Sequence, residues 1–169
     1  MKIGIDVGGT KCLGVAVDDD GKVVQQYRLP TPHADALCDT LVEIVAQLGE
    51  FKSLGIGVPG LISPEGVIRA SPNLVGAKEL ALRQMMQDRL SKKVLVENDA
   101  TCAALGEWKS GAAQGATDAW VITLGTGIGG GFISSSVLQR GAHGFAGEVG
   151  HMVVDPDGPL CPCGRNGCW

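Results

Sequence analysis

Three cysteines and a histidine near the end of the sequence have the types and spacing of a metal site. Cys161, Cys163 and Cys168 fall within eight residues, and His151 lies ten residues before Cys161. Three thiolates and one imidazole form a tetrahedral set that suits Zn²⁺, and four protein ligands leave no position for a reactive water. The alternative is a group of reduced or disulfide-bonded thiols. The spacing therefore predicts a structural zinc site.

Two glycine-rich segments have the composition of phosphate-binding loops. The first is Asp6–Lys11, which reads Asp-Val-Gly-Gly-Thr-Lys, and the second is Leu124–Gly131. Glycine lets the backbone approach a bulky anion, and consecutive N–H groups can surround a phosphate. The hydroxyl of Thr10 adds a donor, and the carboxylate of Asp6 is suited to holding Mg²⁺ through water. The alternative for the first segment is an ordinary hairpin turn, and the alternative for the second is a merely flexible hairpin.

The second glycine-rich segment also contains the spacing G-x-G-x-x-G at residues 125, 127 and 130. In dinucleotide-binding proteins this pattern opens a helix. Here the following residues, Gly131–Ile133, have the character of a strand. We therefore expect a glycine-rich hairpin that faces a phosphate.

Asn98 and Asp99 lie between a predicted buried strand and a predicted helix. Asn and Asp are common helix N-caps, which is one interpretation. The other is a carboxylate that acts as general base on a hydroxyl group, with the helix N-terminus favouring the ionised form of Asp99. The two residues alone leave both interpretations open.

An alternation of strand-like and helix-like segments must position these residues. The expected strands are Lys2–Val7, Lys11–Val17, Lys22–Leu29, Leu54–Val58, Val67–Ala70, Val94–Val96, Trp120–Leu124 and Gly131–Ser135, and the expected helices are Leu37–Leu48, Lys78–Leu90 and Ala100–Ser110. This order predicts an α/β fold with mixed strand directions. We expect a first domain at residues 1–116 and the start of a second at residues 117–169.

Composition and charge exclude several classes of protein. The 169 residues are 44% hydrophobic and 19% charged, which predicts a packed core. The net charge is −4 and no basic run exceeds Lys92-Lys93, so we expect no nucleic-acid partner. No apolar segment is long enough to cross a bilayer and no signal peptide is visible, which predicts a cytoplasmic protein without a membrane partner. Reduced Cys12, Cys38 and Cys102 are then expected in the core.

The motifs occur together in the order typical of the ROK family of sugar kinases and repressors. The family's two phosphate motifs are similar to Ile5–Lys11 and Leu124–Gly131, and its sugar-side loops are similar to Val58–Gly60 and Ser71–Leu74. Its catalytic segment resembles Glu97–Ala100, its signature resembles Gly144–His151, and its zinc knuckle resembles Cys161–Cys168. The resemblance covers the whole chain.

The resemblance implies an actin-like, ribonuclease H-like ATPase fold, with a mixed sheet flanked by helices and a cleft between two domains. It implies ATP-dependent phosphorylation of a hexose, with glucose converted to glucose 6-phosphate as the first expectation. The implied cofactors are Mg²⁺ with ATP and a structural Zn²⁺. The implied assembly is a homo-oligomer, with a dimer expected.

The resemblance also implies residue roles, with Asp99 as the catalytic general base. The implied ligands of the sugar hydroxyls are Asn73, Asn98, Asp99, Glu148 and His151. The implied nucleotide contacts are Asp6, Gly8, Gly9, Thr10, Lys11, Gly125, Thr126, Gly127, Gly129 and Gly130. The implied zinc ligands are His151, Cys161, Cys163 and Cys168, so that His151 serves both metal and sugar.

One departure from the family pattern lies at the end of the sequence. The family's knuckle continues to a sugar-binding Glu two residues after the last Cys, whereas this sequence stops at Trp169. We therefore expect roughly the first half of a family member, with an incomplete second domain and no activity by itself. An alternative is a non-catalytic fragment that binds sugar or pairs with a partner chain.

A ROK transcriptional repressor is a further alternative. It is disfavoured because the first phosphate motif starts at Asp6, which leaves no room for a preceding helix-turn-helix. The motifs do not separate glucose from fructose, allose, N-acetylmannosamine or N-acetylglucosamine, nor ATP from polyphosphate as donor.

Overall fold

The computed structural model describes all residues from Met1 to Trp169 and divides into two compact units, Met1–Asp99 and Ala100–Trp169. Each unit is described by itself. The division into domains at residues 1–116 and 117–169 stays a prediction. None of the helices combines the length and the apolar character needed to cross a bilayer.

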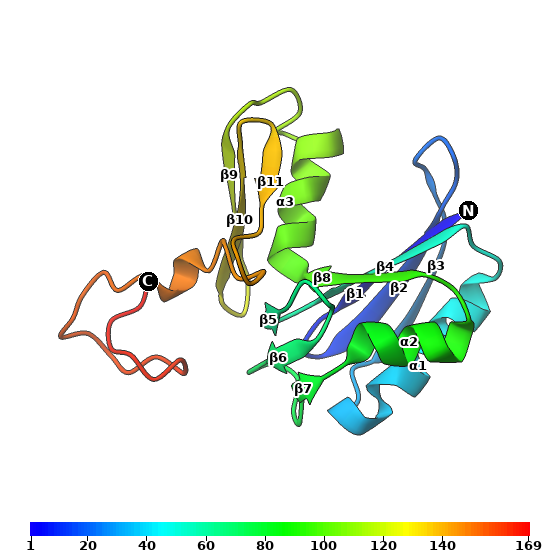
Figure 1. Ribbon diagram of the computed structural model, residues 1–169, viewed down its shortest axis with the longest axis horizontal. Coiled ribbons are helices and arrows are strands. Elements are labelled where there is room, and N and C mark those ends of the chain that lie inside the picture. Colours follow the sequence, from blue (N-terminus) through cyan, green and yellow to red (C-terminus); the bar gives the residue numbers. More distant parts are fainter. The chain divides into compact units, whose positions relative to one another are not determined.

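A five-stranded mixed sheet forms the centre of the first unit (Figure 1). Its strands, in spatial order, are β3 (Val23–Pro30), β2 (Lys11–Val17), β1 (Lys2–Val7), β4 (Ser53–Val58) and β8 (Val94–Asn98). The first three pair antiparallel as two hairpins, whereas β1, β4 and β8 run parallel. The predicted mixed strand directions are therefore confirmed.

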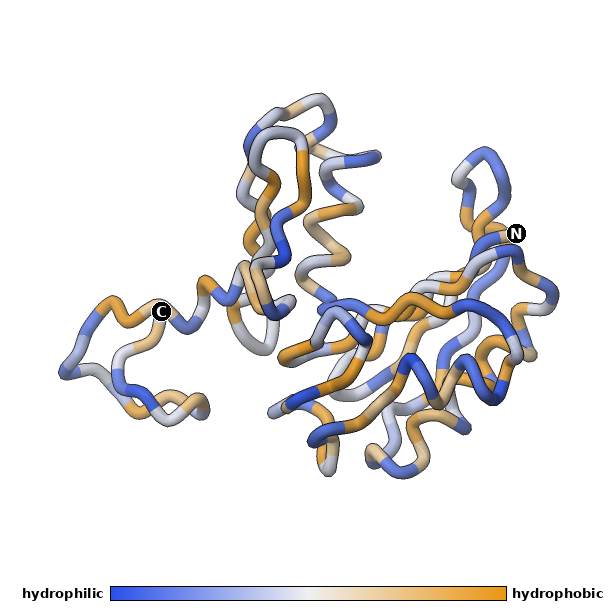
Figure 2. The backbone as a smooth tube through the Cα atoms, in the orientation of Figure 1, coloured by the Kyte–Doolittle hydropathy of each residue, from blue (hydrophilic) through white to orange (hydrophobic).

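Alternating apolar residues build the core of this unit. Ile3, Ile5 and Val7 of β1 are buried, whereas the alternating Lys2 and Asp6 are exposed, as expected for a strand with one covered face. The 3₁₀ turn η1 (Ala34–Ala36) leads into α1 (Leu37–Leu48), which packs with α2 (Leu82–Leu90) against the sheet. Figure 1 shows both helices on one face, and Figure 2 shows β8 as a hydrophobic run between hydrophilic ends.

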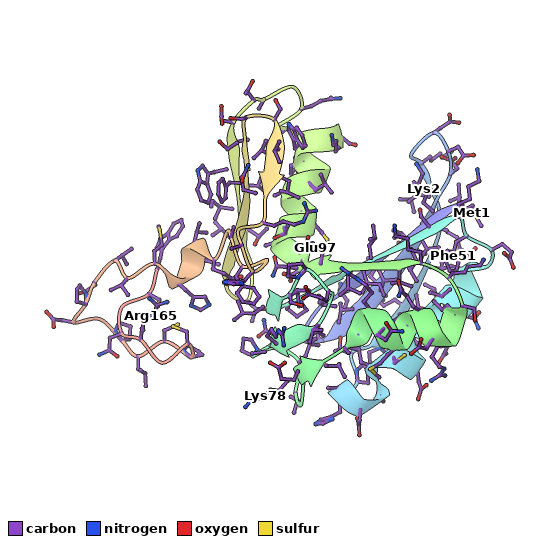
Figure 3. The ribbon with its side chains drawn as sticks, viewed as in Figure 1. Met1, Lys2, Phe51, Lys78, Glu97 and Arg165 are labelled. Atoms are coloured by element: carbon purple, nitrogen blue, oxygen red, sulfur yellow. The ribbon has the colours of Figure 1, made fainter.

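A small antiparallel meander corrects one sequence prediction. It consists of β5 (Leu61–Ile62), β6 (Ile68–Ala70) and β7 (Lys78–Leu80). Because α2 begins at Leu82, the helix expected at Lys78–Leu90 was wrong over its first four residues. Leu80 pairs with Ile68, Lys78 pairs with Ala70, and Glu79 has a left-handed φ of 51°. Pairing with the neighbouring strand β6 overrides the helical pattern of Lys78–Leu80, and Figure 3 labels Lys78.

The second unit begins with α3 (Asp99–Ser110), whose first residue ends the first unit. A sheet of β9 (Ala119–Leu124), β10 (Ile128–Ser134) and β11 (Val137–Gln139) follows. Ala104 of α3 packs with Ile133 and Leu138 in a small core. Cys102 on the same helix is exposed, so its expected core position was wrong, whereas Cys12 and Cys38 are buried as predicted.

The last segment of the chain contains little buried surface. After the 3₁₀ turn η2 (Val149–His151), Gly167 is the only buried residue between Met152 and Trp169. Isolated bridges between Val153 and Cys168 and between Leu160 and Asn166 shape this segment. Burial of apolar side chains therefore contributes little to its order.

Candidate functional site

The parallel strands of the first unit bring three predicted site residues to one edge of its sheet. Asp6 of β1 is in register with Gly57 of β4, and Gly57 is in register with Glu97 of β8, which Figure 3 labels. Asn98 and Asp99 follow Glu97 directly. Because the carboxyl ends of parallel strands meet at the same edge, Asp6 and Asp99 lie at that edge together.

The pKa of Asp6 is raised above its ordinary value. The main cause is loss of surrounding water, the negative charge of Asp99 adds to it, and the positive charge of Lys11 opposes it. Two carboxylates that repel one another favour a bound cation or a proton. This edge is therefore suited to chemistry that needs a magnesium ion and a base.

Asn98 links the strand edge to the two predicted sugar-side loops. Its side chain is buried, and its Nδ2 donates a hydrogen bond of 3.1 Å to the carbonyl oxygen of Gly60. Gly60 has a φ of 108°, and a Cβ there would lie 2.3 Å from the carbonyl oxygen of Ala70. Only glycine permits this approach, which brings residues 58–60 against residues 70–71.

The predicted first phosphate loop, at residues 8–11 (called the first phosphate loop below), is closed by its own backbone. The N–H of Gly8 donates to the carbonyl oxygen of Lys11 at 2.9 Å, whereas the N–H groups of Gly9 and Thr10 donate to no acceptor in the chain. A Cβ on Gly9 would lie 3.7 Å from Asn73, so this loop and the second sugar-side loop are neighbours. The loop thus presents free donors beside a predicted sugar ligand.

Thr31, which no sequence motif marks, also contacts the first phosphate loop. Its hydroxyl donates to the carbonyl oxygen of Gly8 at 2.6 Å, and its backbone N–H donates to the carbonyl oxygen of Thr10 at 3.1 Å. The one local signal is its position between Pro30 and Pro32, which restricts the backbone.

The second glycine-rich segment forms the predicted hairpin. β9 and β10 pair antiparallel, and the N–H of Gly125 donates to the carbonyl oxygen of Gly127 at 3.0 Å. No helix follows, which confirms that the segment is not a dinucleotide fingerprint. A Cβ on Gly125 or Gly127 would meet nothing within 4 Å.

Gly129, Gly130 and Gly131 are required for close packing inside the second unit. A Cβ on Gly129 would lie 2.9 Å from the Cβ of Ala100, and one on Gly131 would lie 2.7 Å from that of Ala104. Both alanines belong to α3, so these glycines let the helix pack closely on β10. A Cβ on Gly130 would lie 2.9 Å from a methyl group of Val149.

The predicted sugar and metal residues of the second unit lie beside this hairpin. A Cβ on Gly147 would lie 2.5 Å from the carbonyl oxygen of Gly130, and one on Gly150 would lie 2.2 Å from that of Ile128. The segment that carries Glu148 and His151 is therefore packed against β10 through glycines. The carboxylate Oε2 of Glu148 is 4.0 Å from Nε2 of His151.

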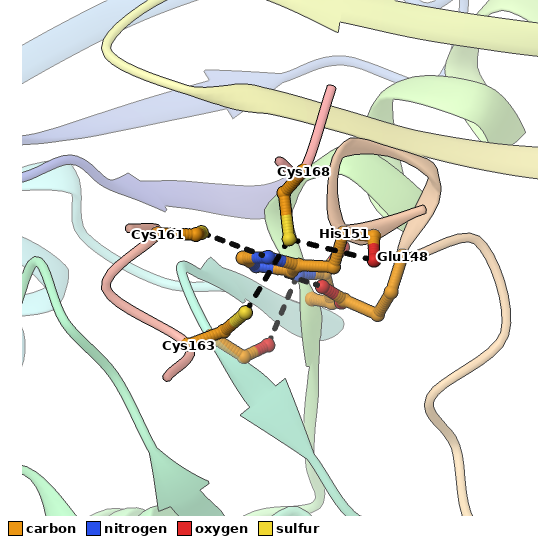
Figure 4. Close-up of polar contacts among 7 residues, drawn as sticks. Glu148, His151, Cys161, Cys163 and Cys168 are labelled. Atoms are coloured by element: carbon orange, nitrogen blue, oxygen red, sulfur yellow. Dashed lines mark hydrogen bonds and ion pairs between the residues drawn. The ribbon is translucent and has the colours of Figure 1, made fainter. Parts of the chain in front are cut away.

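The four predicted zinc ligands converge in the second unit (Figure 4). Their ligand atoms all lie within 4.8 Å of one another. Cys161 Sγ is 3.6 Å from Nδ1 of His151, and Cys163 Sγ is 3.5 Å from Cys168 Sγ. Tetrahedral zinc with ordinary bond lengths separates sulfur and nitrogen by about 3.6 Å and two sulfurs by about 3.8 Å. The donor set therefore fits a zinc ion.

The pKa values of Cys163 and Cys168 are shifted in opposite directions. The backbone N–H of Arg165 is the main influence that lowers the pKa of Cys163, to about 6. Loss of surrounding water, followed by the neighbouring Cys163, raises the pKa of Cys168 to about 11. Thiolates this close repel one another unless a metal ion neutralises them, because a coordinating thiol is bound as the thiolate.

The predicted site residues thus fall into two groups. The first unit contains Asp6, Gly8, Gly9, Thr10, Lys11, Asn73, Asn98 and Asp99, and the second contains Gly125, Thr126, Gly127, Gly129, Gly130, Glu148, His151, Cys161, Cys163 and Cys168. Each group contains one glycine-rich loop and at least two predicted sugar ligands. Their roles toward ligands stay predictions.

Known proteins resemble this chain over its whole length. A glucokinase of Streptomyces coelicolor is 40% identical over 174 residues, which cover 100% of this chain and 55% of that protein. A xylose repressor of Bacillus subtilis is 37% identical over 177 residues, which cover 99% of this chain and 46% of that protein. The chain therefore spans about half the length of the curated relatives it matches.

A solved structure also resembles this chain. The crystal structure of a ROK family glucokinase from Streptomyces griseus, in complex with glucose and AMPPNP, matches 99% of this chain and 55% of that one. The TM-score is 0.91 at 39% sequence identity. The mixed sheet flanked by helices is accordingly the expected actin-like ATPase fold. The sequence profile of the ROK family matches residues 2–169, and the chain belongs to the ROK family.

Proposed function

We propose that the protein carrying this chain transfers the γ-phosphoryl group of ATP to a hexose, with glucose as the substrate and glucose 6-phosphate as the product. The observation that carries the proposal is the edge where Asp6, Asn98 and Asp99 adjoin a loop with free backbone N–H groups. The glucokinase relatives, one of them bound to glucose and AMPPNP, support this choice of substrate and donor.

In this proposal Asp99 is the general base. It accepts the proton of the sugar hydroxyl while the oxygen of that hydroxyl bonds to the γ-phosphorus and ADP leaves. Asn73, Asn98, Glu148 and His151 are assigned to the other hydroxyls. Amide and carboxylate groups suit a neutral sugar, because each hydroxyl both donates and accepts a hydrogen bond.

The two glycine-rich loops contact the phosphates of ATP. Gly8, Gly9, Thr10 and Lys11 supply one set of donors, and the turn at residues 125–130 supplies the other. Asp6 would hold Mg²⁺ through water, and such an ion would supply neutralising charge for the phosphates. Phosphoryl transfer relies on positioning and charge neutralisation, which loops of this kind provide.

Zinc has a structural role in the proposal. His151, Cys161, Cys163 and Cys168 occupy all four positions of a tetrahedral ion, which leaves none for an activated water. Nδ1 of His151 faces Cys161, while its Nε2 lies toward Glu148. A zinc ion bound there would orient His151, to which the proposal also assigns a contact with the sugar.

A sugar-responsive, non-catalytic role is the second candidate, because the xylose repressor of Bacillus subtilis is 37% identical to this chain. A coupled phosphorylation assay separates the two. The protein that carries this chain is supplied with glucose, fructose, allose, N-acetylmannosamine or N-acetylglucosamine, with ATP or polyphosphate as donor. We expect ATP-dependent turnover that is highest with glucose.

Sugar binding without turnover by any donor would contradict the kinase proposal and favour the second candidate. Turnover that is highest with another hexose would retain the reaction and change the substrate. Sedimentation of the same sample tests the predicted homodimer.

A further inference from the structure

Thr31 makes three polar contacts around the first phosphate loop. It follows β3 and donates twice, from its hydroxyl to the carbonyl oxygen of Gly8 and from its backbone N–H to that of Thr10. Its hydroxyl oxygen also lies 3.6 Å from Sγ of the buried Cys12. A hydroxyl has a single hydrogen, which is directed to Gly8, so the thiol of Cys12 is the donor in the third contact.

These contacts decide which polar groups of the loop remain free. The carbonyl of Gly8 accepts from the Thr31 hydroxyl, the carbonyl of Thr10 accepts from the Thr31 N–H, and the carbonyl of Lys11 accepts from Gly8. Carbonyl oxygens carry partial negative charge and repel a phosphate, whereas N–H groups attract it. With three carbonyls engaged, the free N–H groups of Gly9 and Thr10 are left to meet an anion.

The segment around Thr31 also holds the neighbouring sugar-side loop. The N–H of Ala34 donates to the carbonyl oxygen of Val75 at 3.0 Å. Val75 lies two residues after Asn73, whose backbone adjoins Gly9. Residues 31–34 therefore connect to both loops by hydrogen bonds. Pro30 and Pro32 restrict the backbone on either side of Thr31 and so limit its movement.

We propose that Thr31 is a positioning residue for phosphate binding, because its hydroxyl and its backbone N–H engage the carbonyls of Gly8 and Thr10 while the N–H groups of Gly9 and Thr10 stay free. This inference rests on the proposed function, since it concerns the same phosphate loop. Thr31 acts through Gly8 and Thr10.

The kinetic test replaces Thr31 by Val, which keeps the shape and removes the hydroxyl, and by Ser, which keeps the hydroxyl. In the protein that carries this chain, Thr31→Val should raise the KM for ATP by about threefold to tenfold, the equivalent of one hydrogen bond. The dissociation constant for glucose should stay unchanged. Thr31→Ser should restore the KM for ATP.

Thr40→Val is the matched control, because it removes a hydroxyl from α1 that makes no hydrogen bond to either loop. It should leave the KM for ATP at the wild-type value. An equal rise in the KM for ATP in Thr31→Val and Thr40→Val would show a general effect on stability and overturn the inference. An equal weakening of ATP and glucose binding in Thr31→Val would do the same.

Amide hydrogen exchange gives a readout that does not depend on kinase activity. Thr31→Val should speed exchange at the Gly8 amide, which the closed loop protects, while leaving Ile56 in the central strand β4 unchanged. Thr31→Ser should exchange as the wild type does. If the wild type phosphorylates no sugar, the proposed function fails while this measurement still decides the role of Thr31. Unchanged exchange at Gly8 in Thr31→Val overturns the inference.

Discussion

The carboxylates of Asp6 and Asp99 repel each other at one edge of the sheet in the first unit. Asp6 lies near the end of β1 and Asp99 directly follows β8, with β4 between these two strands. Loss of water raises the pKa of Asp6, and the charge of Asp99 raises it further. This arrangement disfavours two ionised groups in the absence of a cation, and it is consistent with a site that binds a metal–phosphate complex.

We expect Asp99→Asn to abolish most of the turnover and to leave sugar binding largely intact. The amide keeps the shape and can still accept a hydrogen bond, but it cannot take the proton. Turnover should fall by roughly 10²- to 10⁴-fold, as is typical when a general base is lost. Steady-state kinetics measure the turnover, and calorimetric titration with glucose measures the sugar binding. Near wild-type turnover would reduce Asp99 to a helix-capping residue.

We expect Asp6→Asn to raise the free energy of unfolding at neutral pH in the absence of Mg²⁺. The folded-state pKa of Asp6 lies above its ordinary 3.8, so folding favours the protonated form. Ionisation therefore costs stability as the pH rises from 3.8 through the folded-state pKa, and the cost persists at neutral pH. The substitution removes that cost.

Chemical denaturation of both proteins from neutral pH down to about pH 4 measures this difference, which should shrink toward the acid end. Asp99→Asn serves as a second check, because it removes the repulsion and should lower the pKa of Asp6. A variant that is less stable than the wild type at neutral pH would contradict the expected repulsion.

Gly127→Ala and Gly131→Ala should separate ligand binding from folding. A Cβ at residue 127 meets nothing, so the fold should tolerate it, while the KM for ATP rises more than that for the sugar. A Cβ at residue 131 would lie 2.7 Å from Ala104, so that variant should lose stability by about 1–3 kcal/mol. Thermal unfolding and kinetics of both variants give the comparison. Equal effects of Gly127→Ala on both substrates, tracking stability, would make the turn purely structural.

The purified chain should contain about one zinc ion, as a single tetrahedral site requires. Cys163→Ala should lose the zinc, and residues 152–169 should then become sensitive to protease, because they bury almost no side chain of their own. Cys102→Ala on α3 is the matched control and should keep its zinc. Elemental analysis and limited proteolysis measure both effects. A zinc-free wild type with a protected C-terminal segment would contradict the assignment.

Gly167→Ala tests the shape of the same segment without removing a ligand. Gly167 has a φ of 66°, and a Cβ there would coincide with the carbonyl oxygen of Asp155. Residues 154 and 155 both donate their N–H groups to the Gly167 carbonyl, so the clash would open the turn that precedes Cys168. Zinc affinity should fall although all four ligands are present, as competition with a chelator can measure. Unchanged affinity would show that the turn adapts.

The sequence by itself determined the features that depend on local patterns. Alternation along β1 predicted its buried face, and the apolar spacing of α1 predicted its core residues, because each pattern reports one covered side. The close spacing of Cys161, Cys163 and Cys168 predicted a cluster of metal ligands, because short loops can bring such ligands together.

The tertiary structure alone decided the features that depend on contacts between separate segments of the chain. Lys78–Leu80 became a strand because β6 supplies its hydrogen-bonding partner, and Cys102 is exposed because α3 turns Ala104 toward its sheet. Thr31 is 23 residues from Gly8 in sequence, so no local pattern marks their hydrogen bond. Spacing defines which groups can meet within one segment, whereas contacts between segments depend on how the strands and helices pack.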